Sequence, residues 1–177
     1  MLARSTMSSL LSNKDYELVT SSVPIVCIDV IPLTYENNTV KLGAIIRATG
    51  SESGKVALIG GRIFKNESIT EAITRHIQKD LSCTSFGYHP LNNEPNPFLV
   101  QQYEHTASPP NKFECFDPTK HSIGLTYLIE LQQNPVATNE ASDFLWLTEK
   151  DINDNFAFGQ DFVFKQVINR LKNNYRP

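Results

Sequence analysis

The chain has 177 residues, of which 40% are hydrophobic and 20% charged, a balance typical of one globular domain with a real core. Its net charge of −3 and its pI near 5.8 disfavour nucleic-acid binding, which usually requires a basic face. No apolar run reaches the roughly 18 residues that a membrane span needs. We therefore expect one domain over residues 1–177, with 1–11 as a loose tail, and neither nucleic acid nor membrane as a partner.

The cysteines Cys27, Cys83 and Cys115 are widely spaced and odd in number. Because none forms a C-x-x-C pair, a disulfide framework or a zinc site is not expected. This usage is typical of a reducing compartment. The N-terminal residues lack the continuous apolar segment of a secretory signal peptide. Together these features predict a cytoplasmic protein.

Strands and helices are predicted from the hydrophobic pattern, taken in chain order. A short helix is expected first, with Ser12 or Asn13 as its N-cap. Apolar segments bounded by turn residues predict strands at 23–33, 40–47, 56–59, 98–103, 123–131 and 144–147. Helical spacing of apolar residues at 69, 72, 73, 77 and 81 predicts a second helix. One helical turn after Thr148 and a final helix over 162–171 complete the pattern.

Two connections carry no clear pattern. Residues 82–96 and 104–120 are expected to be irregular, and loops this long are usually functional or disordered. His105, in the second connection, is one candidate for a base on a lid. Strands joined by both hairpins and crossovers, with helices between them, predict an α/β sandwich: a mixed sheet between helices.

The segment starting at Gly60 reads GGRIFKNESITEAITRHIQKD and contains the spacing Gly61-x5-Glu67-x7-Arg75. Glycines allow the backbone to approach an ion or phosphate closely, because no Cβ intervenes. A strand that turns through glycines into a helix also brings backbone amides near an anion. Glu67 and Arg75 are expected to form a structural pair that fixes the loop to the helix; the alternative is a simple surface ion pair.

This spacing resembles the Nudix box, a strand-loop-helix-loop element that holds a divalent metal against a diphosphate. The resemblance implies a Nudix α/β/α sandwich and a metal-dependent hydrolase. The family has acidic residues where this chain has His76, Lys79 and Asp80, which share one side of the helix. A lysine in place of a carboxylate, about 5 Å from a divalent ion, costs roughly 5 kcal/mol before screening. We therefore expect one Mg²⁺ or Mn²⁺ rather than a cluster.

His76 leaves two roles open. It could ligate the metal, although Mg²⁺ prefers oxygen ligands. Alternatively, it packs at the edge of the helix or contacts the substrate.

Stretches beyond the box, at 11–16, 22–29 and 143–148, are similar to the GDP-mannose mannosyl hydrolase branch of the superfamily. The likeness implies one metal site formed by the Gly60 carbonyl, Asp80 and Glu140. It also implies that Arg47 and Arg62 bind the diphosphate, a task that suits the bidentate guanidinium group.

The same resemblance implies a catalytic set of Glu67, Arg75, Asp80 and His121, with His121 near the diphosphate. Ala141 stands where that branch has its general-base histidine, and an alanine cannot transfer a proton. The expected activity is hydrolysis of a nucleoside diphosphate linked to another group, with a nucleotide sugar as one candidate. The alternative is a module that binds such a ligand without turnover, in which Lys79 pairs with a phosphate.

The N-terminal helix also predicts an assembly. Tyr16, Leu18 and Val19 lie on its apolar side, and a helix of about ten residues is not stable alone in water. In the resembled branch the N-terminal element packs across a two-fold interface. We therefore expect a homodimer.

Overall fold

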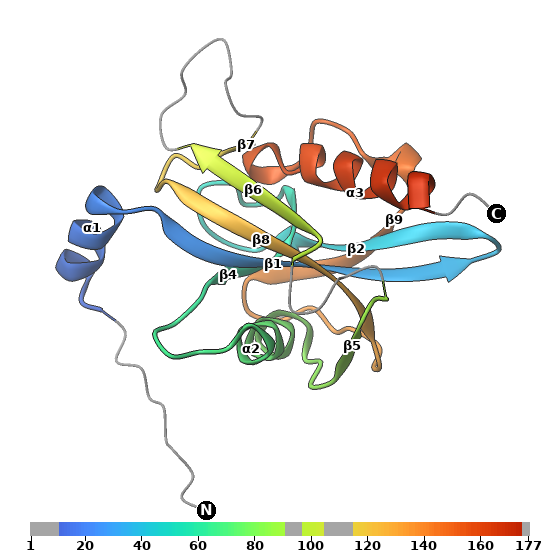
Figure 1. The fold of residues 1–177 in the computed structure, drawn as a ribbon, viewed down its shortest axis with the longest axis horizontal. Helices are drawn as coiled ribbons and strands as arrows, with labels where there is room; N and C mark the ends of the chain where they lie inside the picture. Colours follow the sequence, from blue (N-terminus) through green and yellow to red (C-terminus); the bar gives the residue numbers. More distant parts are fainter. Residues whose placement is uncertain (1–10, 91–96, 105–114, 175–177) are drawn as a thin grey trace, which may run out of the picture.

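The structure, a computed structural model, describes residues 11–90, 97–104 and 115–174. Within them, nine strands form one sheet, the last two α-helices lie against it, and the first α-helix projects from it (Figure 1). The strands are β1 (Ile25–Glu36), β2 (Thr39–Arg47), β3 (Val56–Ala57), β4 (Ile59–Arg62), β5 (Phe86–Tyr88), β6 (Leu99–Glu104), β7 (Cys115–Phe116), β8 (Ser122–Leu131) and β9 (Ala141–Leu147). The helices are α1 (Asn13–Ser22), α2 (Ile69–Leu81) and α3 (Asp161–Asn174), with 3-10 turns η1 (Glu149–Asp151) and η2 (Ala157–Gly159).

The long strand β1 organises the sheet. Its first half pairs antiparallel with β4, and its second half pairs antiparallel with β2. On its other edge it runs parallel to β8 over eight residue pairs. In Figure 1, α3 lies on one side of the sheet and α2 on the other. This arrangement confirms the predicted mixed sheet between helices.

Each face of the sheet contributes to its own core. Ile31 and Leu33 of β1 pack on the α3 side with Phe164, whereas Ile28 and Val30 pack on the α2 side with Ile73. A strand that is covered on both faces has a continuous run of apolar residues, because the side chains on both faces are shielded from water. This explains the run that marked β1 in the sequence.

Helix α2 begins and ends with recognisable caps. Ser68 and Glu71 form a capping box, and Ser82 ends the helix in the left-handed conformation at φ 53°. The residues that face the sheet are buried, including His76 and Asp80. The helical spacing therefore predicted both the helix and its buried face correctly.

Several predicted boundaries were wrong. We expected the chain to turn at Gly60 and Gly61, but both lie inside β4, paired with β1. The turn follows at 63–68 instead. Segments expected to be irregular contain the short strands β5 and β7, whose two or three residues are too few for a periodic signal. The tail at 1–10 and His105 lie outside the described residues.

The β1–β2 turn is formed by Asn37 and Asn38, both at positive φ (50° and 60°). Asparagine tolerates this conformation, which a two-residue hairpin requires. All three cysteines are buried free thiols. None of the helices in the described residues has the length and apolar character that a membrane crossing requires.

Candidate functional site

The two glycines of the box are sterically required where the structure places them. A Cβ built on Gly60 would lie 2.0 Å from the carbonyl oxygen of Ile28. One built on Gly61 would lie 2.9 Å from the His76 ring. Gly60 therefore allows β4 to pair closely with β1, and Gly61 allows α2 to pack closely against β4.

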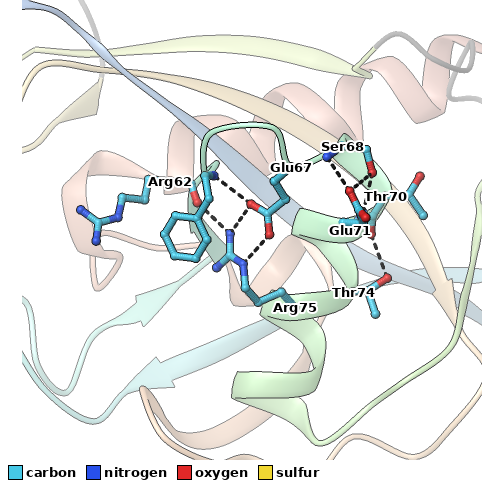
Figure 2. A network of polar contacts seen from close by, with 8 residues as sticks. Arg62, Glu67, Ser68, Thr70, Glu71, Thr74 and Arg75 are labelled. Carbon is cyan, nitrogen blue, oxygen red and sulfur yellow. Dashed lines mark hydrogen bonds and ion pairs between the residues drawn. The ribbon is translucent and has the colours of Figure 1, made fainter. Parts of the chain in front are cut away.

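Glu67 and Arg75 join the loop after β4 to helix α2 (Figure 2). Arg75 donates from Nε to Glu67 Oε1 at 2.6 Å and from a terminal nitrogen to Oε2 at 2.8 Å. Glu67 also accepts from the Phe64 backbone N–H at 2.8 Å, and Arg75 donates to the Arg62 carbonyl oxygen at 2.9 Å. The pair is thus bidentate and tied to the backbone on both sides. Its geometry is that of the structural pair expected from the spacing.

Arg62 holds its guanidinium group between two aromatic rings. The group lies 4.6 Å from the Tyr16 ring of α1 and 5.5 Å from the Phe64 ring. Figure 2 shows the side chain extending away from Arg75, whose own guanidinium stacks on Phe64 at 4.1 Å. A stacked guanidinium keeps its donors at the ring edges free for hydrogen bonds. Arg62 can therefore still bind an anion from this position.

His76 is buried against Gly61 and has no hydrogen-bond partner on either ring nitrogen. Burial, reinforced by the nearby charge of Arg75, lowers its pKa to about 4. The imidazole is therefore neutral at pH 7. Of the roles that the sequence left open, the structure shows the packing role.

Four charged residues meet at the end of α2: Arg47, Lys79, Asp80 and Glu140. Asp80 is only 1% exposed, and its Oδ1 has no hydrogen-bond partner. Lys79 Nζ forms an ion pair with Glu140 and lies 3.9 Å from Asp80 Oδ1. Burial raises the pKa of Asp80 to about 6, although Lys79 acts to lower it. Two acids and two bases thus share one partly desolvated site.

Arg47 reaches this cluster from the end of β2. Its guanidinium lies 5.0 Å from the Phe158 ring, and its buried Nε has no hydrogen-bond partner. Its backbone pairs with that of Ala141, the position at which the sequence lacks a general base. A buried donor or carboxylate oxygen without a partner, such as this Nε and the Asp80 Oδ1, is costly in a folded protein unless a ligand or water satisfies it.

Two other predicted site residues make their contacts with neighbouring strands. His121 precedes β8, and its Nε2 is 3.0 Å from the side-chain nitrogen of Gln102 on β6. Gly60 pairs with Asp29 across β4 and β1. The structure thus brings Asp80 and Glu140 to Lys79, with the charge of Arg47 near Asp80. Arg62 contacts Tyr16 and Phe64, and His121 contacts Gln102.

The sequence did not indicate the role of Asp29. Its carboxylate is 6% exposed and accepts from the Tyr103 hydroxyl at 3.2 Å, in a space that Gly124 leaves open. Gln160 donates to the same hydroxyl at 3.3 Å and accepts from the Leu58 backbone N–H at 2.9 Å. Burial raises the pKa of Asp29 to about 6. Only the tertiary contacts reveal this chain of hydrogen bonds, since its members are far apart in sequence.

Asp29→Asn should make the stability difference from the wild type depend on pH. The native state keeps the Asp29 proton up to about pH 6, whereas the ordinary pKa is 3.8. The native state therefore binds more protons between these values, and the contribution of Asp29 to stability falls as the pH rises through them. Relative to the wild type, the variant should gain about 2.5 kcal/mol between pH 4 and pH 7.5.

Urea denaturation at both pH values would measure this gain. Asp154→Asn, at an exposed position, serves as the control and should show no comparable pH-dependent gain. An Asp29→Asn difference that stays constant between the two pH values would contradict the assignment.

The end of α2 presents two carboxylates of the kind that could hold a divalent cation. Asp80 offers an unpartnered carboxylate oxygen, and Glu140 offers a second carboxylate that also contacts Lys79 Nζ. Carboxylate oxygens are the ligands that Mg²⁺ prefers. Within the described residues, no group of three or more His, Cys, Asp or Glu side chains comes together in the manner of a metal cluster.

Comparison with known proteins places the chain in a family. The family model described as "Domain of unknown function (DUF4916)" matches residues 6–171. The chain belongs to this family. No curated protein matches the sequence of this family member.

Solved structures show which fold this DUF4916 domain has. A possible asymmetric diadenosine tetraphosphate hydrolase from Jonesia denitrificans is 27% identical, with a TM-score of 0.69, covering 83% of this chain and 94% of its own. A MutT Nudix hydrolase from Burkholderia pseudomallei is 16% identical, with a TM-score of 0.60 and coverages of 82% and 98%. The Nudix domain of Shewanella oneidensis NrtR is 17% identical, with a TM-score of 0.58 and coverages of 91% and 99%. The fold is therefore that of Nudix hydrolases.

Proposed function

We propose that this protein binds a nucleoside diphosphate derivative at the end of α2 and hydrolyses it with the help of one divalent cation, Mg²⁺ or Mn²⁺. The observation that carries the proposal is the pair of unsatisfied buried atoms, Asp80 Oδ1 and Arg47 Nε. The Asp80 oxygen can accept a hydrogen bond or bind a cation, and the Arg47 nitrogen can donate to an acceptor such as a phosphate oxygen. A metal–diphosphate ligand supplies both.

The cation would be held by Asp80 and Glu140, with the Gly60 carbonyl as a further oxygen ligand. When bound, such an ion neutralises charge on a diphosphate and polarises the bond to be broken. Arg47 would bind the phosphate from the other side through its guanidinium group. Two features support these assignments. The ligands offer oxygen atoms, and both carboxylates contact the same Lys79 ammonium.

The remaining predicted residues have supporting roles in the proposal. Glu67 and Arg75 position α2 against β4 through their bidentate pair. Arg62 supplies a second guanidinium for the diphosphate from its place between Tyr16 and Phe64. His121 is the candidate for transferring a proton. Its contact with Gln102 would orient the imidazole ring.

The compounds named for two of the similar structures support the proposed class of substrate. The protein from Jonesia denitrificans is described as a possible diadenosine tetraphosphate hydrolase. The Nudix domain from Shewanella oneidensis was solved with ADP-ribose. Both compounds contain nucleosides attached to a chain of phosphates, as a nucleotide sugar does. We therefore propose this shared chemistry as the ligand class, with nucleotide sugars as one member.

A second function, ligand binding without turnover, is favoured by a specific pair of observations. Ala141 is buried beside Arg47 and offers no base there. Lys79 already pairs with Glu140, one of the two carboxylates assigned to the metal. Both features reduce the machinery for water activation and leave the phosphate-binding groups in place.

One experiment separates the two functions and tests Arg47. ADP-ribose, diadenosine tetraphosphate and GDP-mannose are each incubated with the protein and Mg²⁺ or Mn²⁺, with calorimetry for binding and mass analysis for products. Arg47→Ala should weaken the binding of the preferred compound by about 1.5–3 kcal/mol, the range for a hydrogen bond to a charged group. The exposed Lys172→Ala variant should bind as the wild type does.

Each outcome of that experiment has a separate meaning. Product formation supports the hydrolase, and binding without product supports the binding module. Absence of both binding and turnover across nucleoside diphosphate derivatives contradicts the proposal. Equal affinity of Arg47→Ala and wild type would remove Arg47 from the site.

We also propose that α1 mediates a homodimer. No residue of α1 is buried, and Leu18 is 67% exposed. Its contact with the body of the protein includes Tyr16 stacked on Arg62, and α1 projects from the sheet in Figure 1. Light scattering should therefore give twice the 19.9 kDa chain mass, and deleting residues 1–22 should reduce it to a monomer or cause aggregation. A full-length monomer at micromolar concentration would refute the dimer.

A further inference from the structure

Lys79 contacts both carboxylates to which the proposed function, on which this inference rests, assigns the metal. Its ammonium pairs with Glu140 and lies 3.9 Å from the unpartnered Oδ1 of Asp80. Asp80 is almost fully buried, so that oxygen has no access to bulk water. The ammonium is the nearest cation recorded for both carboxylates. The ammonium therefore occupies the position that a divalent ion would need in order to bind both carboxylates.

The loop that carries Glu140 is fixed to the end of α2. Thr138 donates through its hydroxyl to the Lys79 carbonyl oxygen at 2.8 Å and through its backbone N–H to the Asp80 carbonyl oxygen at 2.9 Å. Asn139 donates from its side chain to the Lys79 carbonyl oxygen as well. The backbone at Glu140 is thus held close to the end of α2 by contacts that do not involve the Glu140 carboxylate. These contacts remain whether or not Lys79 pairs with that carboxylate.

Lys79 itself can move. Its side chain is 37% exposed, and a lysine has a flexible four-carbon stem that ends in a compact charge. The pair with Glu140 can therefore break without disturbing the helix or the loop. Only the ammonium, and not the frame that holds the acids, has to leave for another cation to enter.

We propose that Lys79 is a tethered cation that competes with divalent metal for Asp80 and Glu140. In the metal-free protein its ammonium balances the two carboxylates, and a metal ion binds only by displacing it. The affinity of this site for divalent ions is then set by the lysine as well as by the ligands. Removing the ammonium while keeping the stem should convert a weak metal site into a tighter one.

The experiment is a Mn²⁺ titration followed by electron paramagnetic resonance, without nucleotide. Lys79→Met should bind Mn²⁺ about 10-fold to 100-fold more tightly than the wild type, since a positive charge about 4–5 Å from the ion is removed from a screened site. Lys79→Arg keeps the charge and should show no such gain. Lys55→Met, which removes a similarly exposed lysine paired with Glu52, is the control and should also leave the affinity unchanged.

Two further results would decide the matter. Adding Glu140→Gln to Lys79→Met should abolish the gain, because one of the two carboxylates is lost. The proposal is overturned if Lys79→Met binds Mn²⁺ no more tightly than the wild type, or if Lys79→Arg gains as much. Circular dichroism of each variant verifies the fold. Because the assay measures metal alone, its result is independent of whether any nucleotide is bound or hydrolysed.

Discussion

Gly60→Ala should destabilise the protein by at least about 3 kcal/mol. An effect of this size is expected because the added side chain would clash with the backbone. The added Cβ would lie 2.0 Å from the carbonyl oxygen of Ile28, a backbone atom that cannot rotate away. The strand β4 would have to separate from β1, and the pairing of Gly60 with Asp29 would be strained or lost. Urea denaturation followed by circular dichroism measures the change.

Gly87→Ala is the matched control for this prediction. Gly87 lies in β5, and a Cβ built there meets no atom within 4 Å. The same chemical change should therefore alter stability by no more than about 0.5 kcal/mol. If both substitutions cost the same, the cost at Gly60 comes from glycine in a strand and not from the close approach of β1.

Arg75→Ala should cost about 3 kcal/mol of stability, the size expected when one partner of a partly buried ion pair is removed. Glu67, with only 12% of its side chain exposed, would keep one backbone hydrogen bond and lose its bidentate partner. The Arg62 carbonyl oxygen would lose its donor, and Phe64 would lose a stacked guanidinium. A lower denaturation midpoint with an unchanged slope would show that stability alone has changed.

Lys172→Ala provides the comparison for Arg75. It removes an ion pair with Glu149 in which both side chains are more than half exposed. Such exposed pairs contribute about 0–1 kcal/mol, because water screens the charges. An Arg75→Ala effect within that range would show that the pair with Glu67 is a surface ion pair, the alternative that the sequence left open.

The sequence indicated the structural role of the residues in these two predictions with different clarity. The interval between Glu67 and Arg75 predicted their pairing, because the loop and first helical turns between them are local structure. The glycines were also marked, but their place inside β4 was not. Whether a glycine ends a strand or lies within it depends on which backbone comes alongside, here that of Ile28 and Asp29.

The sequence by itself determined the mixed α/β fold, the box helix and its buried face, because hydrophobic period and caps are local signals. It also marked Arg47, Asp80 and Glu140 through a family resemblance. Only the tertiary structure decided that Asp80 and Glu140 meet at Lys79, that His76 is a packed neutral ring, and that Arg62 stacks on Tyr16. Charge pairing and burial depend on distances between segments as far apart as residues 47, 80 and 140, and no local pattern encodes such distances.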